Sequence, residues 1–190
     1  MRRAVFCAFI AFAVILAGAA GAAAPSPHAL YQRLLIRSFP DSQLPSGFFS
    51  AKVGLSKPSK NATKLHVVGE VEVDVDGPDV ADALLYVIFP TRSAALADLK
   101  HTQAPPGGKV AVEGKVPGYR IPSQWVVGSV TGNNAFGQKV TNGITGLFVV
   151  QQNVLIGAVT VSSDNTDSGN TPGALALLKA GLRHLAAASR

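Results

Sequence analysis

The stretch GEVEVDVDGPDVADALLYVIFP, residues 69–90, decides the fold class of this 190-residue chain. Valines alternate with acidic residues from 70 to 76, and one parity stays apolar or glycine back to Leu65. This period of two predicts an antiparallel strand over 65–76 with one buried and one solvated face. Asp76-Gly77-Pro78 predicts a turn. The unbroken apolar run at 84–89 then predicts a strand that is buried on both faces.

Further strands and three helices are predicted on either side of this stretch. Apolar alternation or short apolar runs predict strands at 49–55, 110–112, 125–130, 147–150 and 154–161, the last two as a hairpin. A polar cap followed by proline predicts helix starts at Ser26-Pro27 and Thr171-Pro172, each leading into leucines at helical spacing. A third helix is predicted at 93–99, after Pro90 ends the preceding strand.

The order helix, strands, helix, strands, helix predicts an α+β fold, in which a mainly antiparallel sheet is packed by helices on one face. There is also a weak internal echo: VVGE at 67–70 resembles VVGS at 126–129, and AALADLK at 94–100 resembles ALALLK at 174–179. The echo suggests duplication of a strands-then-helix unit. The two pairs are offset by different lengths, so a duplication would need an insertion in the second half.

The first 25 residues have the pattern of a secretory signal. A basic start at Arg2 and Arg3 precedes fourteen consecutive apolar residues, and small residues then lead to Pro25. We expect a signal peptide over residues 1–22, cleaved within two residues of Ala22, and a secreted or extracytoplasmic location in the cell envelope. The alternative is a retained membrane anchor, although this apolar run is short for a span of about 20 residues.

Residues 23–190 are expected to form one α+β domain, because no linker or low-complexity tract divides them. Cleavage would remove the only cysteine, so we expect no disulfide in the mature protein. It would also remove two of the 17 lysines and arginines, leaving a mildly basic domain. The remaining basic residues are scattered and do not interleave with aromatic residues, which argues against nucleic acid as a partner.

Six of the eleven carboxylates fall between Glu70 and Asp82. Within this cluster DVDGPD resembles a calcium loop, because hard cations take several carboxylate oxygens around a tight glycine turn. The candidate metal ligands are Asp74, Asp76, Asp79 and Asp82. The alternative is a solvated strand face, on which a facing lysine such as Lys52 or Lys57 offsets the repulsion between carboxylates.

Two polar loops are the candidate surfaces for a ligand or partner protein, because loops held by a rigid sheet often carry recognition. One is the glycine- and asparagine-rich stretch at 131–143, and the other is the stretch SSDNTDSGN at 162–170. The candidate binding residues are Asn133, Asn134, Phe136, Lys139, Asp164, Asn165 and Asp167. The aromatic side chains of Trp125, Phe148 and Tyr119 are interpreted as core residues, with a ligand groove as the alternative.

No catalytic motif stands out, and no cofactor is expected. None of the four histidines has a metal-binding spacing, and His101 and His184 are interpreted as lying near helix C-termini, where a partial positive charge is favourable. We therefore expect an exported, non-catalytic domain that binds an unknown partner or small ligand. The alternatives are a secreted hydrolase whose catalytic residues meet only in space and a membrane-tethered envelope protein.

Overall fold

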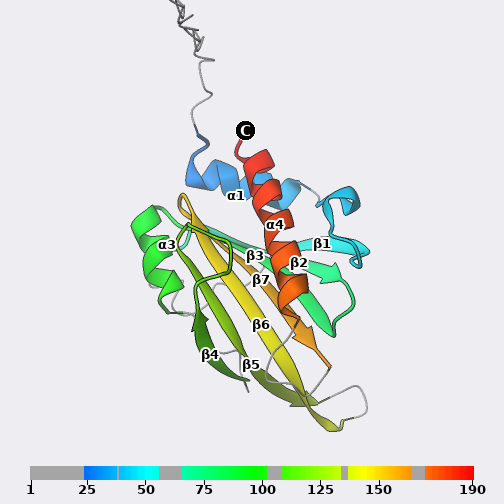
Figure 1. Cartoon of the computed structure of the whole chain (residues 1–190). Coiled ribbons are helices and arrows are strands. Elements are labelled where there is room, and N and C mark those ends of the chain that lie inside the picture. The colour runs from blue at the N-terminus through cyan, green and yellow to red at the C-terminus, as the bar shows by residue number, and fades with distance from the viewer. Residues whose placement is uncertain (1–23, 38, 56–65, 102–107, 134–136, 164–169) are drawn as a thin grey trace, which may run out of the picture.

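The computed structural model describes residues 24–37, 39–55, 66–101, 108–133, 137–163 and 170–190. Seven strands form one fully antiparallel sheet in the order β1-β2-β3-β7-β6-β5-β4. Figure 1 shows the sheet as a twisted layer, with α1 and α4 near one end of it and α3 to the side. This arrangement confirms the predicted α+β fold.

The elements follow one another along the chain with these bounds: α1 (Pro27–Ile36), the short 3₁₀ helix η1 (Asp41–Gln43), β1 (Ser50–Leu55), β2 (Gly69–Asp76), β3 (Ala81–Ile88), α3 (Arg92–Leu99), β4 (Gly108–Gly114), β5 (Ser123–Asn133), β6 (Lys139–Gln151), β7 (Val154–Ser162) and α4 (Thr171–Ala188). Each predicted helix and strand has a counterpart among them. The β6–β7 hairpin turns at Gln152, whose φ of 54° is left-handed, as expected from the sequence.

The opening stretch folds as its pattern predicts. In β2 the valines are buried, because they lie on the face that the helices cover. β3 lies between β2 and β7, so it has a neighbouring strand on each side. Leu84 and Tyr86 enter the core under α4, while Val87 belongs to a second apolar cluster on the other face. Burial on both faces explains why the sequence of β3 is continuously apolar.

The larger core lies between the sheet and the two helices at the chain ends. α4 contributes Leu177, Leu178 and Leu185, and α1 contributes Leu30 and Leu34, all at most 2% exposed. α1 begins as predicted, since the Ser26 side chain accepts a hydrogen bond from the amide of Ala29 and Pro27 follows. α4 begins one residue earlier than predicted, because its cap is Asn170 and Thr171 is already helical. These caps satisfy amides that have no partner inside the helix.

The third helix, α3, lies on the opposite face of the sheet. Its Ala95 and Leu99 pack with Val87, Val150 and Leu155, which point away from the α4 core. The expected helix layer on one face therefore holds for α1 and α4, and α3 covers part of the second face. Because α3 and α4 sit on opposite faces, the two halves are not equivalent, and the structure does not show the suggested duplication.

None of the described helices is both long and apolar enough to cross a membrane. The predicted signal segment at 1–22 lies outside the described residues.

Candidate functional site

The two predicted binding loops lie mostly outside the described residues. This holds for Asn134, Phe136, Asp164, Asn165 and Asp167. Asn133 and Lys139 are register partners at the turn end of the β5–β6 hairpin, and Lys139 is exposed. β7 ends and α4 begins at this same end of the sheet (Figure 1).

The structure does not bring the four candidate metal ligands together. Asp74 and Asp76 are exposed on the outer face of β2, where Lys52 of β1 is the register partner of Asp74 and the Ser50 hydroxyl donates to Asp76. Asp82 lies on the opposite face, since its register partner is the core residue Val75. Within the described residues, no group of three or more metal-ligating side chains occurs.

Asp79 belongs to a polar cluster beside the start of α4. Asp79 accepts a 2.8 Å hydrogen bond from the side-chain amide of Asn170, which caps α4 by accepting from the amide of Gly173. Thr160 of β7 donates to the carbonyl of Asn170 at 3.1 Å. This cluster therefore ties the β2–β3 turn and the sheet to the first turn of α4.

Asp82 is 4% exposed, and neither of its carboxylate oxygens has a hydrogen-bond partner in the described structure. Burial, reinforced by the negative charge of Asp79, raises the pKa of Asp82 to about 7. A large part of the Asp82 population is therefore protonated near neutral pH. Because a neutral carboxyl group is a poor cation ligand, the raised pKa of Asp82 favours a structural role over metal binding.

The aromatic side chains that were interpreted as core residues pack against the two apolar clusters. Trp125 and Tyr119 pack against the α4 core, and Phe148 packs against the cluster under α3. The hydroxyl of Tyr86, in the middle of the sheet, donates to the carbonyl of Gly181 in α4 at 3.2 Å.

His184 does lie near the C-terminus of α4, but it is a buried core residue and does not supply the predicted favourable positive charge there. It is 1% exposed and stacks against Phe39, with ring centroids 4.7 Å apart. Its pKa is lowered to about 4 by burial and by the positive charge of Arg37. The imidazole is therefore neutral at neutral pH. His66 and His101, by contrast, are exposed, in the segments before β2 and after α3 respectively.

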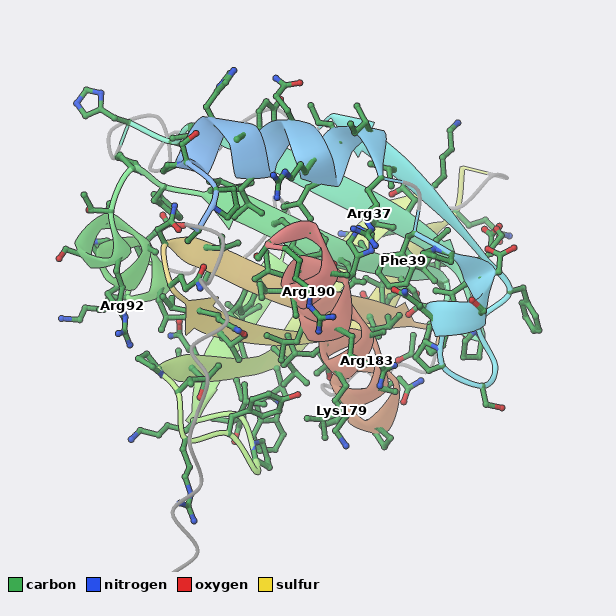
Figure 2. All side chains as sticks on the ribbon, turned by 90° about the horizontal axis from the view of Figure 1, so that it is seen from above. Arg37, Phe39, Arg92, Lys179, Arg183 and Arg190 are labelled. Carbon is green, nitrogen blue, oxygen red and sulfur yellow. The ribbon has the colours of Figure 1, made fainter. Side chains whose placement is uncertain are left out.

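An open pocket of about 410 Å³ lies where α1 meets the C-terminal end of α4. Figure 2 looks down on this end, with Arg37 and Arg190 near it, Lys179 and Arg183 further along α4, and Arg92 apart from them. The pocket is lined by Arg33, Ile36, Arg37, Ala187, Ala188 and Arg190. It therefore combines three guanidinium groups with small and apolar side chains.

Two of these arginines are positioned by the fold. Arg33 lies in the last turn of α1 and Arg37 is the residue that caps its C-terminus, so both lie at this end of the helix. Arg33 donates to the carbonyl of Ala188 at 3.2 Å, and Arg37 donates to that of Ala187 at 2.9 Å. These carbonyls belong to the last turn of α4, where no further turn can satisfy them.

The pocket is electrostatically suited to an anion. A guanidinium group has five N–H donors in a planar fork that matches carboxylate or phosphate oxygens. The three guanidinium charges of the pocket exceed the roughly half negative charge at the C-terminal end of α4. Sequence reasoning missed this site, because Arg33 and Arg190 are 157 positions apart in the numbering. The only available signal was the spacing of Arg33 and Arg37 within one helix.

The fold and the pocket together define a class: an α+β sheet protein with a basic, open pocket at the meeting point of its first and last helices. No protein-family model matches this chain, and no curated protein matches its sequence. The function must therefore be argued from the site.

Proposed function

We propose that this chain is an exported, non-catalytic domain that binds a small anionic ligand in the arginine-lined pocket. The observation that carries the proposal is the grouping of Arg33, Arg37 and Arg190 around one open cavity. Its described lining contains no histidine, serine or acidic side chain, so it offers groups for binding an anion and no side chain suited to proton transfer near neutral pH.

The ligand class is narrowed by the apolar part of the pocket. Ile36 is 81% exposed, which is unusual for a large aliphatic side chain, and it lies beside the arginines. An anionic head group with a short hydrocarbon portion could pair its oxygens with guanidinium groups and cover Ile36. We therefore propose an amphiphilic carboxylate or phosphate as the ligand class.

Calorimetric titration with four probes tests this proposal: inorganic phosphate, hexanoate, hexyl phosphate and uncharged hexanol. We expect hexyl phosphate to bind most tightly, inorganic phosphate and hexanoate more weakly, and hexanol not to bind. Binding should weaken as salt increases, because ionic attraction at an exposed site is screened. If none of the three anions binds at low salt, the proposal is wrong.

Variants locate the binding site. Arg190→Gln should weaken the binding of all three anions, because it removes a charge that lines the pocket without removing a hydrogen bond to α4. Arg92→Gln is the matched control, since Arg92 lies on α3, away from the pocket (Figure 2). Ile36→Ser should weaken the binding of hexyl phosphate but leave the binding of inorganic phosphate unchanged. Equal effects of Arg190→Gln and Arg92→Gln would show a nonspecific charge effect.

The export part of the proposal rests on the N-terminal sequence alone and needs its own test. Intact mass measurement of the protein recovered outside the cytoplasm should give the mass expected for loss of residues 1–22. An uncleaved N-terminus in a membrane fraction would favour the tethered envelope protein instead. The hydrolase alternative gains no support from His66 and His101, which are exposed in separate segments of the chain.

A further inference from the structure

Among the residues that the structure describes, β4 at the end of the sheet has a neighbouring strand on one edge and none on the other. It is the terminal strand of the sheet and pairs with β5. The exposed edge of such a strand presents backbone N–H and C=O groups that can pair with another strand. β4 is unusually accessible, since Lys109 and Ala111 to Gly114 are exposed and Val112 is 58% exposed.

The sequence of this edge, KVAVE at 109–113, is complementary to itself in charge. When two copies of an antiparallel strand pair about a two-fold axis perpendicular to the sheet, one residue must face its own copy. With Ala111 at the axis, Lys109 of each copy lies opposite Glu113 of the other. Val110 of each copy then faces Val112 of the other, so three apolar pairs are flanked by one pair of opposite charges at each end.

Pairings centred on the residue before or after Ala111 lack this charge complementarity. Centring on Val112 would place Lys109 opposite Lys115, and centring on Val110 would leave Glu113 beyond the paired segment. The register with β5 shifts between Val112 and Gly114, so Glu113 has no register partner in β5. Charges on an edge strand usually prevent pairing with other strands, but here they favour one specific partner.

We propose that two copies of this chain dimerise by antiparallel pairing of their β4 strands, centred on Ala111. The two seven-stranded sheets then form one continuous sheet, with the α1 and α4 layers of both copies on the same side. The arginine pockets lie at α1, remote from β4 in the strand order, so they stay open in the dimer. The paired segment is short, so the dimer is expected to be weak and to dissociate on dilution.

Sedimentation velocity of the purified protein, from micromolar to near-millimolar concentration, tests this dimer. The unmodified chain should shift from monomer to dimer as concentration rises. Lys109→Glu and Glu113→Lys should each weaken the dimer roughly tenfold or more, because each places two pairs of like charges across the interface. Both residues are exposed, and circular dichroism checks that each variant is folded.

Two restoration experiments make the register specific. The double variant Lys109→Glu/Glu113→Lys should dimerise like the unmodified chain, because the opposite charges are exchanged in place. An equimolar mixture of the two single variants should form a heterodimer, since every cross-strand pair then has opposite charges. A protein that stays monomeric at every concentration overturns the proposal. A dimer that all these variants leave unchanged also overturns it, because that dimer uses another face.

Discussion

At the scale of single residues, His184 makes stability sensitive to acid. In the unfolded chain a histidine takes up its proton near pH 6.5, whereas burial and Arg37 lower the pKa of His184 to about 4 in the folded protein. The unfolded state binds more protons in this range, so this contribution is complete above pH 6.5 and is lost as the pH falls towards 4.

We predict that His184→Leu removes this loss. The slope due to one group is at most about 1.4 kcal/mol per pH unit. By urea unfolding, the stability at pH 7 minus the stability at pH 4.5 should be lower for the variant than for the unmodified chain, because only the opposing contribution of Asp82 remains. His101→Leu is a suitable control, because His101 is exposed. If both variants lose stability with acid alike, His184 is not the group responsible.

Asp82 acts in the opposite direction. Its pKa is 3.8 in a model compound and about 7 in the folded protein, so the folded state holds its proton where the unfolded state has lost it. Its contribution is complete below about pH 3.8 and is lost as the pH rises through 7. We predict that Asp82→Asn is more stable than the unmodified chain at pH 8, by denaturant unfolding. A less stable variant would show that the ionised carboxylate has a favourable partner.

His184 also offers a readout of the proposed ligand. Arg37 lines the pocket and lowers the pKa of His184, so an anion bound beside Arg37 should offset that charge. We predict that saturating hexyl phosphate raises the pKa of His184 measured by NMR, and that Arg37→Gln raises it without ligand. A pKa of His184 that stays unchanged when the ligand is bound would place the ligand elsewhere.

At the scale of elements, β5 contains a matched pair of glycines that tests the packing of β4. A Cβ atom on Gly128 would overlap the backbone carbonyl of Lys109, whereas one on Gly132 would meet nothing within 4 Å. We predict that Gly128→Ala destabilises the protein by about 1–3 kcal/mol and that Gly132→Ala changes it little. Hydrogen exchange should be faster in β4 of the first variant. Equal effects would show that β4 can shift at no cost.

Most elements could be predicted from local pattern. The alternation in β2 and the proline caps of α1 and α4 are signals within one segment, and they depend on the nearest neighbours. The start of the long predicted strand at 65–76 was less well placed, since β2 begins at Gly69 and residue 65 lies outside the described residues. The face covered by α3 was not predicted, because β3 is apolar on both sides.

At the scale of the whole molecule, the two buried ionisable groups oppose each other. Between about pH 4 and 6.5, the contribution of His184 rises with pH while that of Asp82 falls. We predict that their sum is nearly flat across this range, and that the double variant His184→Leu/Asp82→Asn keeps the pH profile of the unmodified chain. Scanning calorimetry across the range checks this. A double variant with a steep profile would show that other groups dominate.

The candidate sites, like the secondary structure, could be predicted only in part. The interpretation of the acidic run as a solvated strand face holds for Asp74 and Asp76, and Lys52 does lie opposite Asp74, but Glu70 is buried. Asp82 could not be separated from that run, since the turn at 77–80 carries the chain to the next strand and places Asp82 on the helix-covered face. The arginine pocket could not be predicted, because it forms only where the two ends of the chain come into contact.

By itself, the sequence determined the positions of the helices and strands, the antiparallel character of the sheet and the expectation of export. These follow from periodicity, caps and composition, which act over a few neighbouring residues. The tertiary structure alone decided that α3 covers the second face, that His184 is buried and neutral, and that Arg33, Arg37 and Arg190 share one pocket. The physical reason is that burial and charge pairing depend on which distant segments pack together, and a local pattern records only that a side is apolar.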